Sequence, residues 1–322
     1  MISRRGVLAG AGAALCLTEE RALAQAWPAR PITAVVPFPA GGNVDITARL
    51  VGGPVSAAIG QQIVVDNRPG AGGNIGNEMV ARAAPDGHTI LFTQGGMAVN
   101  RFLYKNLRYD PSTDFAPISL LVLVPNVLVV PSSSPVKTVA DFIDYAKSRK
   151  LLYASAGNGT SSHLSGELLK RKLGIETTHV PYRGTSLGVG DLIAGRVDVT
   201  CDNVSTLLPH INAGALRALA VTTRERLSVL PDVPTMQASG VHDFKSSGWT
   251  AVYAPAKTPS EIVQRLHAAL SAAIRQADVR RTIETSGTVP VGSSPLELAA
   301  FVKEETDTWG PIIRDANISI EG

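Results

Sequence analysis

The chain has 322 residues, of which 44% are hydrophobic and 18% charged, and its formal net charge at pH 7 is +3. It has no basic run with interleaved aromatic residues, so its composition argues against a nucleic-acid partner. Beyond the first residues, no apolar stretch is long enough to cross a membrane. A chain of this length exceeds one comfortable core, and two domains are therefore expected.

The N-terminal segment has the order of an export signal. Arg4 and Arg5 precede a small-residue apolar stretch at 6–17, and Ala22-Leu23-Ala24 provides a cleavage site. We expect residues 1–24 to be removed and the mature protein to lie in the periplasm. The arginine pair also resembles the twin-arginine pattern, so export in the folded state and the general route both stay open.

Cleavage would remove three basic and two acidic residues, so the net charge would fall from +3 to +2. These residues are Arg4, Arg5, Arg21, Glu19 and Glu20. Cys16 would leave with the signal and Cys201 would remain alone, so neither an intramolecular disulfide nor a cysteine-based zinc site is expected. We expect a monomer without a metal or a cofactor.

Strand-like and helix-like segments alternate from residue 32 onward, which favours parallel sheets flanked by helices. Apolar, mostly β-branched runs predict strands at 32–38, 63–65, 89–92, 151–155, 177–181, 197–201 and 216–222. Apolar residues at helical spacing predict helices at 44–59, 75–83, 138–150, 164–173 and 187–194. Thr138 and Asp141 are expected to form a capping pair at the start of one helix, and Gly60 and Gly174 are expected to end the helices that precede them.

Two further apolar segments are predicted to cross between two lobes. Residues 120–130 form the longest apolar run of the mature chain, and residues 249–254 form a strand at the return point. The helices that follow begin at predicted capping boxes, Thr258/Glu261 and Ser294/Glu297, and are expected to pack on the first lobe. The predicted organisation is a signal peptide (1–24), lobe 1 (25–124 and 250–322) and lobe 2 (125–249). Paired crossings of this kind suit a hinged protein that closes on a ligand.

Glycine-rich turns separate a strand from a helix at three places. These are Gly41-Gly42, Gly72-Gly73, and Gly157 with Gly159. Turns at the carboxyl ends of parallel strands converge on one crevice, where free N–H groups and helix dipoles suit an anion. Because almost no Lys or Arg lies in these loops, we expect a carboxylate. The alternative, that the glycines only permit tight turns, stays open.

Five short motifs follow one another in a characteristic order. They are Pro-Phe-Pro-Ala-Gly-Gly at 37–42 with Asp45, Asn-Arg-Pro-Gly-Ala-Gly-Gly at 67–73, Ala-Pro-Asp-Gly at 84–87, Val-Pro-Tyr-Arg-Gly at 180–184 and Leu-Pro-Asp-Val-Pro-Thr at 230–235. In this order they resemble the Bug-type extracytoplasmic solute receptors of tripartite tricarboxylate transporters. The resemblance implies an α/β periplasmic binding protein of type II-like fold, whose two lobes close on an organic acid or similar carboxylate. It also implies delivery to the membrane subunits of a transporter.

The resemblance places ligand contacts on the loops 38–42 and 71–73 of the first lobe and on 155–161, with His163, of the second. The expected ligand-binding residues are Phe38, Ala40, Gly41, Gly42, Asp45, Ala71, Gly72, Gly73, Ser155, Asn158, Thr160, Ser161, His163, Arg183 and Asp202. Some of them have a structural alternative. Asp45 fits a favourable first-turn acid, His163 a capping or packing role, and Arg183 a solvated surface position. Asp202 would orient a ligand ammonium or hydroxyl group, or else cap the next helix.

An enzyme is a rival class, because glycine turns on α/β sheets also serve catalysis. The chain lacks a Gly-x-Ser-x-Gly elbow, a phosphate loop ending in Gly-Lys, a His-Glu-x-x-His pair and a Gly-x-Gly-x-x-Gly at the first strand. Its 6 histidines are scattered. We therefore expect a binding protein without catalysis. A sensor subunit that presents its ligand to a signalling partner is the alternative, followed by an α/β enzyme acting on carboxylates.

Overall fold

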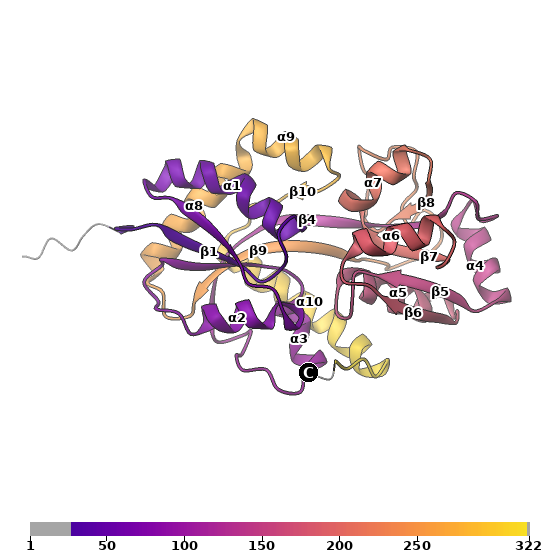
Figure 1. Ribbon diagram of the computed structural model, residues 1–322, viewed down its shortest axis with the longest axis horizontal. Helices are drawn as coiled ribbons and strands as arrows, with labels where there is room; N and C mark the ends of the chain where they lie inside the picture. The colour runs from indigo at the N-terminus through magenta and orange to yellow at the C-terminus, as the bar shows by residue number, and fades with distance from the viewer. Residues whose placement is uncertain (1–26, 321–322) are drawn as a thin grey trace, which may run out of the picture.

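The structure is a computed structural model that describes residues 27–320, in which strands and helices alternate along the chain (Figure 1). The strands are β1 (Ile32–Val36), β2 (Ile63–Asn67), β3 (Thr89–Thr93), β4 (Phe115–Pro131), β5 (Leu151–Ser155), β6 (Thr177–Pro181), β7 (Val199–Asn203), β8 (Leu216–Val221), β9 (Ser247–Pro255) and β10 (Val289–Pro290). The helices are α1 (Asn43–Ile59), α2 (Asn74–Ala81), α3 (Gly96–Leu103), α4 (Val139–Ser148), α5 (Ser161–Leu173), α6 (Thr185–Ile193), α7 (Val204–Asn212), α8 (Ser260–Arg275), α9 (Ala277–Thr285) and α10 (Pro295–Asp315). A short 3-10 turn, η1 (Ala71–Gly73), precedes α2.

Two long strands join the two lobes. The first part of β4, Phe115–Pro125, pairs antiparallel with β9, and its last part pairs with β7 and β8. Parallel strands lie outside these crossings, in the order β2-β1-β3 on one side and β7-β5-β6 on the other. We call the part with β1–β3, α1–α3 and α8–α10 lobe 1, and the part with β5–β8 and α4–α7 lobe 2. The predicted fold class, with two lobes, two crossing strands and a discontinuous lobe 1, is confirmed.

Helices cover both faces of the sheet in each lobe, which explains why the strands are apolar runs and not alternating patterns. In lobe 1, α1 and α8 pack on one face through residues such as Val51 and Leu266, both fully buried, and α2, α3 and α10 cover the other (Figure 1). A second core on the α10 side runs from Trp309 of lobe 1 to Leu164 of lobe 2. Each such buried side chain stabilises the fold by about 1.5–3 kcal/mol.

Capping side chains and glycines at helix ends allowed several helix boundaries to be predicted from the sequence. Thr138 and Ser294 both form the capping boxes expected of them, and Gly60 and Gly174 end α1 and α5 in the left-handed conformation. The prediction of a capping box at Thr258 is wrong. Helix α8 begins at Ser260 after Pro259, whose carbonyl accepts the first helical hydrogen bonds, whereas the Thr258 N–H closes a turn onto Pro255.

Helices α3, α7 and α9 were not predicted. Two glycines begin α3 and Pro209 lies inside α7, and both features lower helix propensity. A short strand was also not predicted: β10 lies between α9 and α10 and pairs with β4.

None of the helices within residues 27–320 is long and apolar enough to cross a membrane. The predicted signal peptide and its cleavage near Ala24 lie outside the described residues. Cys201 is a free, buried thiol of lobe 2, and burial raises its pKa to about 12.

Candidate functional site

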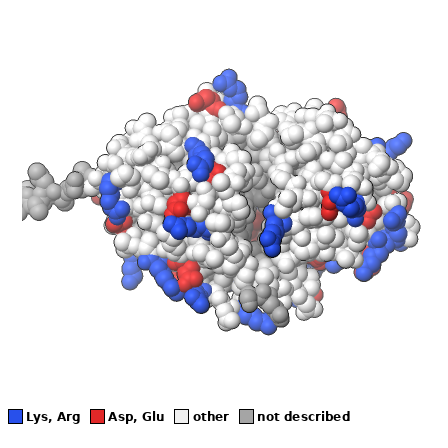
Figure 2. All heavy atoms as spheres, viewed as in Figure 1, with Lys and Arg blue, Asp and Glu red and all other residues white. Residues whose placement is uncertain are grey.

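A cavity of about 110 Å³ lies where the carboxyl ends of β1, β3, β5 and β7 meet between the lobes. This is where an open α/β sheet is expected to bind a ligand. Its lining residues are Phe38, Gly72, Gln94, Gly95, Gly96, Val99, Asn100, Ala156, Asn158, Gly159, Thr160, Ser161, Leu164, Asp202, Asn203, Ser247, Gly248, Trp249, Glu305 and Trp309. Figure 2 shows a furrow between the lobes, with basic and acidic side chains scattered over this face singly and in pairs. We call this cavity the cleft. Its volume is below the roughly 300–1,000 Å³ of pockets for drug-sized ligands, so it suits only a small ligand.

The cleft brings together only part of the predicted site. Predicted residues that line it are Phe38, Gly72, Asn158, Thr160, Ser161 and Asp202. Predicted residues outside its lining are Ala40, Gly41, Gly42, Asp45, Ala71, Gly73, Ser155, His163 and Arg183. Arg183 is exposed on the surface of lobe 2.

Asp45 holds the loop 38–42 in place through hydrogen bonds and does not line the cleft. Its Oδ2 accepts the Gly41 N–H at 2.9 Å, and its Oδ1 accepts from Asn67 at 3.0 Å, while Asn67 also donates to the Phe38 carbonyl. Arg49, one turn later, adds an ion pair at 3.0 Å. Burial pushes the pKa of Asp45 upward, but the hydrogen bonds from Arg49, Gly41 and Asn67 outweigh it, so the net shift is downward. Asp45 is therefore a charged brace for the loop.

The backbone N–H groups of these glycines differ in whether they already have an acceptor within the protein. Gly41 donates to Asp45, Gly42 to the Pro39 carbonyl at 3.4 Å, and Gly73 to the Gly70 carbonyl at 3.0 Å. The Gly72 N–H has no acceptor among residues 27–320. Gly72 also has a φ of +64°, and a Cβ there would lie 2.4 Å from the Tyr104 hydroxyl. Of these four amides, that of Gly72 is the one available to a ligand.

The start of α3 is a part of the site that the sequence analysis missed. Gln94, Gly95 and Gly96 follow β3 and line the cleft. The first hydrogen bonds of the helix come from Met97 and later residues, so the described chain offers no acceptor for the N–H groups of Gly95 and Gly96. The pattern of strand, paired glycines and helix was present here as at the other turns, and it could have been found by the same rule.

The second-lobe loop is held by its own side chains. Thr160 accepts the His163 N–H at 3.3 Å as the N-cap of α5 and donates to the Gly157 carbonyl at 2.7 Å. Ser161 lines the cleft, and its hydroxyl has one hydrogen-bond partner among the described residues, Oδ1 of Asn203, 3.5 Å away. Ser161 is thus freer than Thr160 to contact a ligand.

His163 supports this loop from behind. It is buried, and its Nδ1 accepts the Gly159 N–H at 3.0 Å. Its ring stacks on His179 with 4.1 Å between centroids, and His179 Nε2 lies 2.6 Å from the hydroxyl of Ser155. Burial lowers the pKa of both histidines to about 4, so both rings are neutral at pH 7.

Two acids enter the cleft from opposite lobes. Asp202, 2% exposed at the end of β7, accepts from the Thr185 hydroxyl at 2.8 Å and from the Asn203 N–H at 2.7 Å. Burial raises its pKa to about 6. Glu305 of α10 accepts the indole N–H groups of Trp249 and Trp309, each at 3.2 Å. Burial also raises the pKa of Glu305. The lining contains no Lys, Arg or His.

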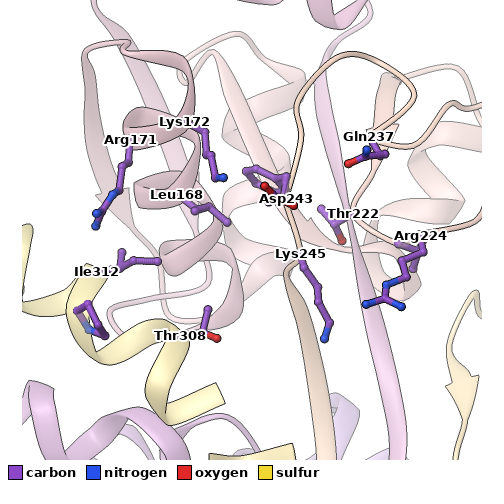
Figure 3. A pocket seen from close by; sticks show the side chains of 13 residues that line it. Leu168, Arg171, Lys172, Thr222, Arg224, Gln237, Asp243, Lys245, Thr308 and Ile312 are labelled. Atoms are coloured by element: carbon purple, nitrogen blue, oxygen red, sulfur yellow. The ribbon is translucent and has the colours of Figure 1, made fainter. Parts of the chain in front are cut away.

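A larger groove of about 910 Å³ lies further along α5 and α10 (Figure 3). The basic side chains Arg171, Lys172, Arg224 and Lys245 line it. Arg171 is paired with Asp315 and Lys245 with Glu304, and the bases in the last turn of α5 favourably meet the negative end of its dipole. The lining of this groove includes neither a strand end before a helix nor a helix N-terminus, so the cleft is the better candidate for the ligand site.

Within residues 27–320, no group of three or more His, Cys, Asp or Glu side chains is placed to hold a metal ion. The TctC family, described as the tripartite tricarboxylate transporter family receptor, matches residues 47–318. The chain belongs to this family. The TctC assignment agrees with the resemblance found in the sequence motifs, which is thereby confirmed.

Other TctC-like proteins cover nearly the whole chain. A UPF0065 protein from a tcbD-tcbE intergenic region of Pseudomonas sp. (strain P51) is 44% identical over 316 residues, or 97% of this chain and 94% of that protein. The R. palustris protein Rpa4515, solved with adipate, is 39% identical with a TM-score of 0.84, covering 91% of this chain and 100% of its own. The periplasmic binding protein BugD is 34% identical with a TM-score of 0.81, over 91% and 100% of the two chains.

As a TctC-family member, the protein is an extracytoplasmic solute-binding receptor of a tripartite tricarboxylate transporter. The family is one of receptors without enzymatic activity, which confirms the expectation of a binding protein.

Proposed function

We propose that this receptor captures a small carboxylate in the cleft and delivers it to the membrane subunits of its transporter. The observation that carries the proposal is the convergence of free N–H groups on a small cavity without basic side chains. Backbone donors and helix N-termini bind a carboxylate well. A phosphate, with its greater charge, would call for Lys or Arg. The adipate in Rpa4515 supports this ligand class.

The proposed contacts are the Gly72, Gly95 and Gly96 amides on lobe 1 and the Ser161 hydroxyl on lobe 2. Phe38, Asn158, Thr160 and Asp202 complete the walls. Asp45 and His163 hold the two ligand loops in place by accepting the Gly41 and Gly159 N–H groups and do not contact the ligand. Arg183 lies at the surface.

Binding is coupled to closure in this proposal. Lobe 1, at 25–124 and 250–322, and lobe 2, at 125–249, rotate about β4 and β9, because a few dihedral angles in two strands suffice for a hinge. Closure brings Ser161 to a ligand seated on lobe 1 and excludes water, which strengthens each hydrogen bond. Residues 1–24 act as the export signal, cleaved near Ala24, by the general or the twin-arginine route.

A thermal-shift screen of the mature protein tests the ligand class. Mono-, di- and tricarboxylates, aromatic acids and amino acids are compared with phosphate and sugars. A ligand at 100 times its Kd should add about 2.7 kcal/mol to the free energy of unfolding. The variants Lys172→Ala and Arg224→Ala, in the basic groove, should leave the shift unchanged. Stabilisation by phosphate or sugars but not by any carboxylate would refute the proposal.

A further inference from the structure

The basic groove, the space of about 910 Å³ along α5 and α10, has no part in the proposed capture of the ligand. Four bases line it, Arg171, Lys172, Arg224 and Lys245, against one acid, Asp243. Figure 3 shows that they come from separate segments: Arg171 and Lys172 from α5, Arg224 from the segment after β8, and Lys245 between Lys172 and Arg224. A concave surface with this charge attracts an anionic partner.

The four bases are available to such a partner. Lys172 and Arg224 are exposed, and neither forms an ion pair within residues 27–320. Arg171 and Lys245 pair with acids of α10, but all four side chains in these two pairs are more than half exposed. Exposed ion pairs contribute only about 0–1 kcal/mol. Both bases can therefore exchange their acids for the acids of a partner.

The floor of the basic groove is apolar. Leu168 of α5, Phe244 and Ile312 of α10 line it and are largely buried. A flat membrane surface offers anionic headgroups to the bases but no group that reaches this floor. An acidic peptide segment with an apolar side chain meets both requirements, because its carboxylates face the bases while its apolar side chain leaves water. The groove therefore fits a protein segment better than a lipid surface.

The basic groove also lies at the hinge. The hydroxyl of Thr222, in its lining, donates to the Ser246 carbonyl at 2.5 Å and accepts the Asn126 N–H at 3.1 Å. Asn126 belongs to the crossing strand β4, and Ser246 directly precedes the other crossing strand, β9. The groove has α5 of lobe 2 on one side and α10 of lobe 1 on the other, so rotation of the lobes alters its shape. A partner seated there would distinguish the closed receptor from the open one.

We propose that the basic groove is the docking site for an acidic, partly apolar extracytoplasmic segment of the transporter's membrane subunits. This inference rests on the proposed function, since it takes those subunits as the partner. Docking and ligand capture then use different residues, because no base of the groove lines the cleft. The two can therefore be tested separately.

Binding of the mature protein to the membrane subunits in phosphatidylcholine vesicles tests the docking site. The double variant Lys172→Glu/Arg224→Glu should bind at least about tenfold more weakly, mostly through slower association. Wild-type binding should also weaken when the salt concentration is raised from about 0.05 M to about 0.5 M. The matched control is Lys105→Glu/Lys257→Glu, at two exposed bases outside the lining of the groove. It makes the same change in net charge and should bind as the wild type does.

Two further measurements complete the test. The thermal shift given by a carboxylate should be the same in the double variant and in the wild type, which shows that the variant folds and captures its ligand. A change of Asp or Glu to Lys in the docking segment of the membrane subunits should restore binding of the double variant. An equal loss in the control variant would mean that net charge alone acts, and would overturn the inference.

The lipid alternative is tested with phosphatidylglycerol vesicles that lack the membrane subunits. Wild-type binding to these vesicles that the double variant loses, with binding to the subunits unchanged, would make the groove a lipid contact and overturn the inference. If the double variant binds the subunits as well as the wild type does, docking in the groove fails and the proposed function stands. If the wild type captures a carboxylate but never binds the subunits, the proposed delivery fails and the docking site fails with it.

Discussion

The hydroxyl of Ser205 donates to Oδ1 of Asn43 across the two lobes, 3.2 Å away. Asn43 begins α1 directly after the first glycine turn, and Ser205 lies in the first turn of α7 after Asp202 and Asn203. The loops that line the cleft are therefore also the loops that touch between the lobes. We expect this contact to form part of the coupling between ligand binding and lobe closure.

Ser205→Ala should shift the lobes toward an open arrangement. A neutral hydrogen bond contributes about 0.5–1.5 kcal/mol, so the affinity for a carboxylate should fall roughly 2- to 12-fold. Small-angle scattering should show a larger radius of gyration at equal ligand saturation. Ser148→Ala, on α4 and bonded only to the Tyr145 carbonyl, is the control. An unchanged radius of gyration in the wild type with and without ligand would contradict closure.

Ser161→Ala and Thr160→Ala should separate ligand contact from loop support. Ser161 has one weak partner, so its loss should lower affinity severalfold with little change in stability. Thr160 caps α5, and its loss should cost about 1 kcal/mol of stability. Urea unfolding and isothermal titration measure the two effects. The assignment is wrong if Ser161→Ala alone destabilises the fold and leaves affinity unchanged.

Asp202 should make the protein less stable as the pH rises from about 4 to about 6. Its pKa is raised by burial from 3.8 to about 6, so the folded state binds the proton more tightly than the unfolded state. Stability is thus highest below the unfolded pKa, and about 3 kcal/mol is lost as the pH passes the folded pKa. Asp202→Asn removes this dependence.

Urea unfolding of the wild type and Asp202→Asn at several pH values measures that difference. The free energy of unfolding of the variant relative to the wild type should increase from pH 4 to pH 7. A constant difference over this range would show that Asp202 titrates normally. Effects of the two buried histidines occur in both proteins and cancel in the comparison.

The ring protons of His163 and His179 should titrate near pH 4 in NMR spectra. Burial lowers both pKa values from 6.5, so the stability that these rings provide is complete above pH 6.5 and declines as the pH falls toward 4. His163→Gln assigns the two resonances. Midpoints near 6.5 would mean that both rings are open to water and that the loop lacks this support.

Gly72→Ala should destabilise the protein by about 1–2 kcal/mol or more, because its positive φ is unfavourable for alanine. The added Cβ also meets the Tyr104 hydroxyl, so Tyr104→Phe should partly rescue the variant. Gly53→Ala, inside α1 with no atom within 4 Å of the new Cβ, should be neutral or stabilising. No rescue in the double variant would mean that backbone strain alone is responsible.

The sequence alone determined the features that depend on neighbouring residues. Strand and helix periodicity, the caps at Thr138 and Ser294 and the stops at Gly60 and Gly174 act within a few residues, and they could be predicted. The same holds for the order of the family motifs and for the paired crossings, because residues 120–130 of β4 form an apolar run that is interrupted only at Pro125-Asn126. Short apolar helices such as α3 were not predicted, because glycine at the start obscures the helical spacing of the apolar residues.

Only the tertiary structure decided which groups line the cleft. The Gly41 N–H was expected to be available to a ligand, but it donates to Asp45. His163 lies outside the cleft lining, because its ring stacks on His179. Glu305 was not considered, since nothing near it in the chain indicates a cleft. It reaches the site because α10 packs beside α3 and β4 and places Glu305 against Trp249 of the crossing strand. Contacts so distant in sequence depend on how whole elements pack, and no local pattern encodes them.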